Sequence, residues 1–276
     1  MSKGLAGRAA IVTGGSRGVG RACALALARE GVKVVVAAKS VREREKLPGT
    51  IHSVADEIAA LGGEAFPVAC DVRDRDQIRG LVARTIDRFG RLDILVCNAG
   101  AMWWRPLIDT PPKRFDLMMQ VNLEATFFAC QEAIPHMRAN RWGHIITMSP
   151  PADLARLPGR IAYFISKVGM TMVAQGLAEE LKGDHIAANA LWPVTLIDSQ
   201  ATRNWGLGDP TMWRKPDILA DAAVAIVKHD PAALTGRALL DEPFLRSLGV
   251  TDFEKYSVVA GATIPRLDEL WKQAGG

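Results

Sequence analysis

The stretch Thr-Gly-Gly-Ser-Arg-Gly-Val-Gly, residues 13–20, follows an apolar run at residues 9–13 and precedes a helical pattern. Its glycines are spaced Gly-x-x-x-Gly-x-Gly, from Gly14 through Gly18 to Gly20. A turn between a strand and a helix needs residues without a Cβ where the backbone must approach a bound pyrophosphate, and the helix N-terminus then presents free N–H groups to it. The order of strand, glycines and helix therefore predicts a dinucleotide site, with a tight turn that binds no ligand as the alternative.

Beyond this stretch, short apolar runs rich in β-branched residues alternate with longer amphipathic stretches. Such runs suit strands covered on both faces, and their alternation with helices indicates parallel strands joined by right-handed crossovers. We therefore expect a doubly wound α/β fold, a Rossmann-like three-layer αβα sandwich whose central, mostly parallel sheet has seven strands. The expected strands are residues 9–13, 32–37, 65–69, 94–96, 145–148, 186–191 and 237–240, and the expected helices include residues 19–30, 51–61, 77–89, 115–138 and 164–181.

Length and composition favour one domain. A chain of 276 residues with 49% hydrophobic content suits a single α/β domain over residues 1–276. Residues 193–216 are rich in Trp, Gly and Pro and only weakly periodic, so we expect a mobile lid or substrate loop there, or else a plain surface excursion. Residues 241–276 are expected to form a C-terminal extension.

Charge, hydropathy and cysteine usage argue against several other classes of protein. The formal net charge of +4 comes from interleaved acids and bases, so no nucleic-acid partner is expected. No run approaches the roughly 20 apolar residues of a membrane helix and residues 1–10 lack a secretory signal, so we expect no membrane span and a cytoplasmic location. The histidines are scattered and the cysteines widely spaced, so we expect no metal site and four reduced, buried thiols. The cysteines are Cys23, Cys70, Cys97 and Cys130.

The end of the second expected strand bears on the choice of nicotinamide cofactor. An NAD enzyme of this architecture usually has an acid there, which holds the ribose 2′-hydroxyl, whereas this chain has Lys39 and Ser40 and no acid before Glu43. Arg17 and Lys39 could instead pair with a 2′-phosphate, so NADP(H) is favoured and NAD(H) is the alternative. The cation-rich segment 40–49 could close over that phosphate or remain a solvated loop.

A second constellation points to proton transfer. Tyr163 and Lys167 are four residues apart at the start of an expected helix, so they lie on one face, one turn apart. The pKa of a free tyrosine is about 10, too high for an efficient base near neutrality, so a cation must favour the phenolate, and Lys167 is placed for that. Ser149 follows the strand expected at residues 145–148, where its hydroxyl could hydrogen-bond a reacting oxygen.

The glycine loop and the Tyr-x-x-x-Lys pair together resemble the short-chain dehydrogenase/reductase family, whose glycine loop is Thr-Gly-x-x-x-Gly-x-Gly. The resemblance implies an oxidoreductase that interconverts an alcohol and an aldehyde or ketone by moving a hydride between a nicotinamide and the substrate. It further implies that Tyr163 transfers the proton, that Ser149 binds the reacting oxygen, that Lys167 also binds the nicotinamide ribose and that Asn122 supports a water relay.

The same resemblance extends to Asp71-Val72, similar to the family's adenine-contacting pair, and to Asn98-Ala99-Gly100. It implies a homodimer or homotetramer assembled through the two long helices expected at residues 115–138 and 164–181. The cofactor contacts expected from the motifs are Thr13, Gly14, Ser16, Arg17, Gly18, Val19, Gly20, Lys39, Asp71, Val72, Asn98, Ala99, Gly100, Tyr163, Lys167, Pro193 and Thr195.

Two departures from the family pattern are visible. Ser149 is followed by Pro150-Pro151, which removes two backbone donors. Most relatives have Pro-Gly after the sixth strand, whereas this chain has Trp-Pro-Val-Thr at residues 192–195 and lacks the freedom of glycine there. These features, with residues 46–51 and 249–253, resemble the subgroup of hydroxysteroid dehydrogenase-like protein 2, whose bacterial relatives are often labelled dehydrogenases of terpenoid alcohols such as citronellol.

The tryptophans suggest the character of the substrate. Five of the seven lie after the fourth and sixth expected strands, at the carboxyl ends where open α/β sheets bind ligands, so they favour an apolar alcohol or carbonyl substrate. Packing in the core or in an oligomer is the alternative for each of them. The rival to catalysis is a cofactor-binding sensor or scaffold without turnover. The candidate pocket residues are Trp103, Trp104, Trp192 and Trp205.

Overall fold

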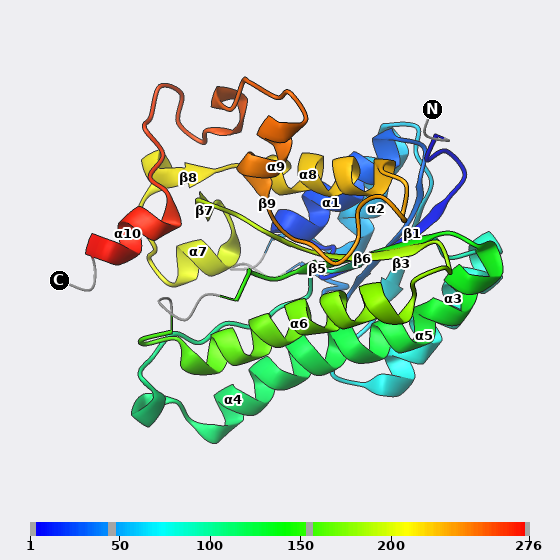
Figure 1. Cartoon of the computed structure of the whole chain (residues 1–276), viewed down its shortest axis with the longest axis horizontal. Coiled ribbons are helices and arrows are strands. Elements are labelled where there is room, and N and C mark those ends of the chain that lie inside the picture. The colour runs from blue at the N-terminus through cyan, green and yellow to red at the C-terminus, as the bar shows by residue number, and fades with distance from the viewer. Residues whose placement is uncertain (1–3, 44–47, 153–156, 274–276) are drawn as a thin grey trace.

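The computed structural model describes residues 4–43, 48–152 and 157–273, and a parallel sheet runs through the middle of this part of the chain (Figure 1). Residues 44–47, within the cation-rich segment, lie outside the described residues. The spatial order of the strands is β3-β2-β1-β4-β5-β6-β9, and every neighbouring pair is parallel. The strands are β1 (Ala9–Thr13), β2 (Lys33–Ala38), β3 (Ala65–Ala69), β4 (Ile94–Cys97), β5 (Gly143–Met148), β6 (Ile186–Trp192) and β9 (Ala238–Leu240).

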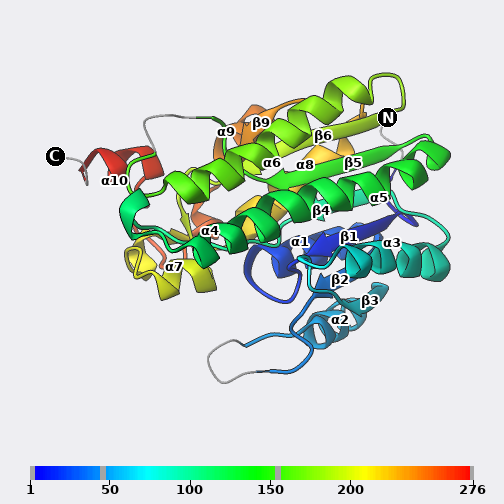
Figure 2. The ribbon, with the colours of Figure 1, turned by 90° about the horizontal axis from the view of Figure 1, so that it is seen from below.

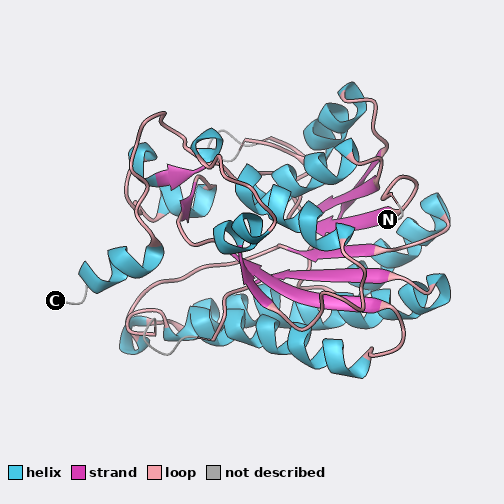
Figure 3. Cartoon of the chain, turned by 45° about the horizontal axis from the view of Figure 1, so that its top comes forward, coloured by secondary structure: helices cyan, strands magenta, loops and turns pink. Residues whose placement is uncertain are grey.

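Helices cover both faces of the sheet, as Figure 3 shows. Side chains of β1 alternate between the layers: Ala10 and Val12 pack towards α1, α2, α8 and α9, whereas Ala9 and Ile11 pack towards α3, α5 and α6. This arrangement confirms the three-layer Rossmann-like fold expected from the sequence. The helices of these layers are α1 (Gly18–Arg29), α2 (Ile51–Ala60), α8 (Asp217–Lys228), α9 (Asp241–Ser247), α3 (Arg75–Phe89), α5 (Ala125–Asn140) and α6 (Ile161–Glu180).

The topology creates a ligand edge. The chain runs outward from β1 to β3, then crosses to the other side of β1 and continues through β4, β5 and β6. Because strand order reverses between β1 and β4, the loops after these strands diverge and leave a crevice at their carboxyl ends. The loop that follows β1 is the glycine stretch, so the topology places it at this crevice.

The long helix expected at residues 115–138 is present but not uniform. It comprises α4 (Pro112–Met118), the π-helical segment Met119–Glu124 and α5. Asn122 is buried within the π-helical segment. Figure 2 shows α5 and α6 side by side on one face of the molecule.

The segment 193–216 is more structured than its weak periodicity suggested. It contains β7 (Leu196–Ile197), α7 (Gln200–Asn204) and β8 (Trp213–Arg214), and β7 pairs with β8 in parallel. In Figure 1 these elements gather beside α10 (Leu267–Gln273), and Leu196, Trp213 and Leu267 share one apolar cluster. The expected substrate segment and C-terminal extension therefore pack against each other.

Two composition-based expectations concern α6 and the cysteines. Within residues 4–43, 48–152 and 157–273, α6 is the one helix long and apolar enough to cross a membrane. It nevertheless packs against β5, β6 and α5 in the sandwich, an arrangement that core helices of globular proteins share. All four cysteines are free and buried, as the sequence predicted.

Candidate active site

A cavity of about 550 Å³ lies at the carboxyl ends of β1, β2, β4, β5 and β6. The segment after β6 and α7 close it on one side, and Leu267 of α10 also lies on its wall. The residues of the wall that the sequence predicted to contact the cofactor are Gly14, Ser16, Arg17, Gly18, Val19, Lys39, Asp71, Val72, Asn98, Ala99, Gly100, Tyr163, Lys167, Pro193 and Thr195.

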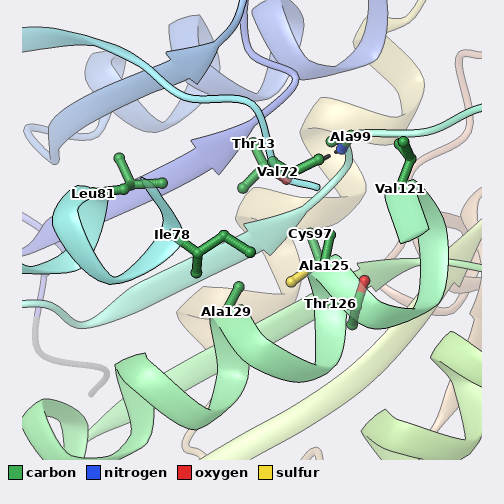
Figure 4. Close-up of a pocket in the computed structure, with 10 residues that line it drawn as sticks. All are labelled: Thr13, Val72, Ile78, Leu81, Cys97, Ala99, Val121, Ala125, Thr126 and Ala129. Atoms are coloured by element: carbon green, nitrogen blue, oxygen red, sulfur yellow. Dashed lines mark hydrogen bonds between the residues drawn. The ribbon is translucent and has the colours of Figure 1, made fainter. Parts of the chain in front are cut away.

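Thr13 and Gly20 are not on this wall but support it from behind. The Thr13 hydroxyl donates to the Val96 carbonyl at 3.2 Å and accepts from the backbone N–H groups of Asn98 and Ala99 at 3.0 and 3.1 Å. It therefore joins the ends of β1 and β4. Thr13 and Ala99 also border a second cavity of only about 10 Å³, a packing gap between α3, β4 and α5 that Figure 4 shows.

Three of the four glycines at residues 13–20 occupy positions where the geometry requires glycine. Gly14 and Gly18 have φ values of +65° and +52°, in the left-handed region that favours glycine. A Cβ on Gly20 would lie 2.4 Å from the Gly14 carbonyl oxygen and 2.5 Å from Asn98 Nδ2, so only glycine lets α1 approach so closely. Helix α1 begins at Gly18, and the Arg17 side chain does not cap it, which leaves its first N–H groups for a ligand.

Cations and a hydroxyl gather where β2 ends. Lys39 and Ser40 lie on the cavity wall together with Arg17. The Arg17 guanidinium donates to Ser40 Oγ at 3.0 Å and to the Gly49 carbonyl at 2.9 Å, so it ties the glycine loop to the segment before α2. Asp71, across this end of the cavity, has its pKa lowered first by a hydrogen bond from Arg73 and also by Lys39.

Tyr163 and Lys167 lie on the wall at the opposite end, on the first turns of α6. Lys167 Nζ donates to the Met148 carbonyl at 2.7 Å. Burial raises the pKa of Tyr163 and lowers the pKa of Lys167 to about 8. Desolvation is therefore the main cause of both pKa shifts, whereas the sequence led us to expect that Lys167 would favour the tyrosinate.

Ser149 is next to this pair in the fold but is not on the cavity wall. Its side chain is fully buried, and its hydroxyl lies 2.9 Å from the hydroxyls of both Thr147 and Thr171. Thr171 also donates to the Pro150 carbonyl at 2.6 Å. The structure thus holds the Ser149 hydroxyl against β5 and α6 and not towards the cavity.

Asn122 forms hydrogen bonds with the backbone of the segment after β4, next to the cavity. Its amide exchanges two hydrogen bonds with the backbone of Ala101, at 2.7 and 3.0 Å, and Nδ2 also donates to Ser166 Oγ at 2.8 Å. Asn122 therefore fixes the segment after β4 relative to α6. It is not on the wall of the cavity.

The four tryptophans expected around the substrate separate into two pairs. Trp104 and Trp192 are on the wall, and the ring of Trp104 lies 6.0 Å from that of Tyr163. Trp103 and Trp205 are not on the wall; they contact each other edge to face at 5.5 Å. The packing alternative therefore describes the second pair.

Several wall residues were not anticipated from the sequence. They are apolar side chains, whose type does not distinguish a cavity wall from a core, and some lie in elements too short to show any period. Leu117 comes from α4, Val121 from the π-helical segment, Ile197 from β7 and Leu267 from α10.

The Rossmann-like fold and the cavity with its glycine loop, tyrosine and lysine are typical of one class of protein, and comparison with known proteins identifies the same class. The profile described as short chain dehydrogenase matches residues 8–208, and the chain belongs to the short-chain dehydrogenase/reductase family, a family of oxidoreductases that bind NAD(P).

Three similar proteins show how far the likeness extends. The chain is 43% identical over 260 residues to hydroxysteroid dehydrogenase-like protein 2 of Bos taurus, which covers 93% of this chain but 62% of that relative's length. The protein in a crystal structure from Xanthomonas campestris is 43% identical to this chain, and the two folds superpose with a TM-score of 0.92. The match covers 96% of this chain and 98% of the other. A metagenomic short-chain oxidoreductase in complex with NADP is 32% identical with a TM-score of 0.73, covering 86% and 98%.

Proposed function

We propose that the protein is an NADP(H)-dependent oxidoreductase that interconverts an apolar alcohol and the corresponding aldehyde or ketone. The observation that carries the proposal is one continuous cavity with the glycine loop in its middle, Lys39 at one end, and Tyr163 and Lys167 at the other. A dinucleotide has the same order of parts: a phosphorylated adenosine, a pyrophosphate and a nicotinamide.

The wall suits this cofactor along its length. The uncapped N-terminus of α1 and the close approach allowed by Gly14 and Gly18 favour a pyrophosphate. Lys39, Ser40 and Arg17 supply positive charge and hydrogen-bond donors where a ribose 2′-phosphate would lie, and no acid occupies the end of β2. The same positions support NADP(H) over NAD(H).

The chemistry divides between cofactor and protein. When bound, the nicotinamide supplies or accepts the hydride. Tyr163 exchanges the proton with the substrate oxygen, and because burial raises its pKa, the neutral phenol that carbonyl reduction requires predominates. Lys167, held at the Met148 carbonyl, brings a positive charge to the same end of the cavity. Trp104 and Trp192 give that end an apolar surface suited to a terpenoid, fatty or steroid-like substrate.

One observation favours a rival function. The Ser149 hydroxyl is bonded to Thr147 and Thr171 and would have to rotate to reach a substrate oxygen. A protein that binds NADP(H) as a sensor or scaffold, without turnover, would not need that rotation.

Titration with NADPH and NADH, followed by tryptophan fluorescence, tests the cofactor site first. Absorbance at the NADPH band, monitored on adding long-chain and terpenoid aldehydes, then tests turnover. Tyr163→Phe should bind NADPH as the unmodified chain does and lose about 100-fold or more in rate, because it keeps the ring but lacks the proton. Binding without turnover across the panel would favour the sensor, and binding of neither cofactor would refute the proposed dinucleotide site.

A further inference from the structure

Val194 lies in the segment between β6 and β7 that forms one wall of the cavity. Its backbone N–H donates to Asp241 Oδ1 at 3.0 Å, and its carbonyl accepts from the backbone N–H of Leu267 at 2.8 Å. The two peptide groups that flank Val194 are therefore fixed by residues from two later elements, α9 and α10. The side chain of Val194 is itself buried.

Asp241 is an unusual residue to find in this place. It is fully buried, and its Oδ1 accepts from Val194 N–H and, at 2.7 Å, from Glu242 N–H. Its Oδ2 has no hydrogen-bond partner in the described part of the chain, and burial raises the pKa of the carboxyl to about 6. Burying a carboxyl group costs free energy, and the two hydrogen bonds that Oδ1 accepts offset this cost.

Charged residues next to Asp241 also connect this wall of the cavity to α9. Arg214 forms a buried ion pair with Glu242, whose carboxylate also pairs with Arg246 at 2.6 Å. Arg214 belongs to β8 and pairs in register with Ile197 of β7, which directly continues the Val194 segment. Asp241 and this ion pair therefore anchor both halves of the segment to the start of α9.

Residues near the start of α10 make a second set of contacts with the Val194 segment. Thr195 pairs with Arg266 through an isolated antiparallel bridge, next to the bond between Leu267 and Val194. Leu267 is the first residue of α10, and its side chain both lines the cavity and packs on Leu196. The C-terminal segment is thus part of the cavity wall.

The held wall belongs to one half of the cavity. Pro193 and Thr195 line it where Tyr163 and Lys167 lie, because β6 neighbours β5 and α6 packs on both strands. The end with Lys39 lies on the far side of β1 in the strand order. Displacement of Val194 should therefore disturb the reacting end and leave the adenosine end intact.

We propose that Asp241 and Leu267 are positioning residues, which hold Val194 from both sides and so set the wall that contacts the nicotinamide half of the cofactor. The inference rests on the proposed NADP(H) site. In this role, the Asp241 carboxylate and the Leu267 backbone N–H take the place of the Pro-Gly turn that this chain lacks.

The test compares two probes by isothermal titration calorimetry: NADP⁺, and 2′-phospho-ADP-ribose, which has the same adenosine and pyrophosphate but no nicotinamide. Asp241→Ala should weaken NADP⁺ binding about tenfold, as expected for one lost buried hydrogen bond, and leave 2′-phospho-ADP-ribose unchanged. Asp241→Asn keeps an acceptor oxygen, so its affinity for NADP⁺ should lie between that of the unmodified chain and that of Asp241→Ala.

Leu267 offers a matched pair of variants. Leu267→Pro removes the N–H, and proline suits the first position of a helix, whereas Leu267→Ala keeps the N–H and removes only the side chain. Leu267→Pro should weaken NADP⁺ binding more than Leu267→Ala does. These variants also test the inference if Asp241→Ala fails to fold.

Asp93→Ala is the control for general loss of stability. Asp93 is another fully buried carboxylate, but it lies just before β4, at the amino-terminal ends of the strands and so opposite the cavity, where it accepts from the Ala9 N–H at 2.9 Å. Its removal should lower stability without separating the two probes. Equal losses for both probes in the Asp241 and Leu267 variants, or no loss for either, would refute the positioning role. Failure of the unmodified chain to bind either probe would instead refute the proposed function, and the inference with it.

Discussion

Under the proposed function, we expect Lys39 to set the preference between the two nicotinamide cofactors, because it lies on the cavity wall at the end of β2, where an acid would favour NAD(H). Lys39→Ala should weaken NADPH binding about tenfold or more, the usual scale for a lost hydrogen bond to a charged group, and leave NADH binding nearly unchanged. Fluorescence titration with both cofactors measures the ratio.

Lys33→Ala is the matched control for this prediction. Lys33 starts the same strand at its far end and pairs with Glu64 at 3.5 Å, so its loss should affect neither cofactor. Equal weakening of NADPH and NADH by Lys39→Ala would contradict a phosphate-binding role.

At the residue scale, the sequence predicted best the positions that follow from spacing along one helix. Tyr163 and Lys167 share a helix face, so their common place on the wall followed from a separation of four residues. The direction of the Ser149 hydroxyl did not follow, because it depends on Thr147 and Thr171, and the latter is a partner on another element. Burial likewise decides the pKa of Tyr163, and a motif does not reveal burial.

At the scale of elements, the contact between the glycine loop and α1 makes a sharp prediction. Gly20→Ala should lower the free energy of unfolding by about 1–3 kcal/mol, because the new Cβ would meet backbone and must displace it. Gly80→Ala, inside α3 and with no described heavy atom within 4 Å of the added carbon, should instead raise stability by about 0.5–1 kcal/mol. Urea denaturation measures both, and equal effects would contradict the close approach.

The main sheet and most of its long helices were predicted from the sequence, although the 12-residue helix α8 was not among the helices named. The strands of the main sheet and the helices α1, α2, α3 and α6 have bounds within about three residues of those expected, because burial on both faces writes a strong pattern. The elements β7, α7 and α10 are too short to write any period and owe their form to packing around Leu196, Trp213 and Leu267. The π-helical turn around Asn122 was also missed, since its apolar pattern continues that of the flanking helix.

At the scale of the whole molecule, His144 in β5 ties stability to pH. Burial lowers its pKa to about 3, whereas the pKa in an unfolded chain is about 6.5. Between these values the unfolded chain takes up a proton that the folded protein does not, so the free energy of unfolding should fall with falling pH, by about 2 kcal/mol from pH 7 to pH 5.

His144→Phe should flatten this dependence while keeping an aromatic ring against Trp142, whose ring centroid lies 4.7 Å away. Urea denaturation at pH 7 and pH 5 provides the comparison. His52→Phe, at an exposed position of α2, is the control and should leave the slope as it is. An unchanged slope in His144→Phe would show that another group governs acid sensitivity.

Large apolar side chains on α5 and α6 bear on assembly. Phe127 is 51% exposed and Met172 is 68% exposed, on neighbouring helices of one face. We expect these helices to form the interface of a homodimer or homotetramer, so Phe127→Glu with Met172→Glu should give monomers in size-exclusion chromatography with light scattering. Leu61→Glu, at the end of α2 and 50% exposed, should not. A monomeric unmodified chain would contradict this expectation.

The positioning role proposed for the two hydrogen bonds on Val194 implies an order of events during synthesis. The chain emerges from its N-terminus at about 5–20 residues per second, so the glycine loop, Tyr163 and Lys167 are all made before Asp241 and Leu267. We expect a nascent chain that has reached only β9 to be able to bind a pyrophosphate, but it lacks the residues that bond the Val194 peptide groups. Full cofactor affinity should therefore arrive only after residue 267 has been made, and a ribosome stalled before residue 267 should present an incomplete site.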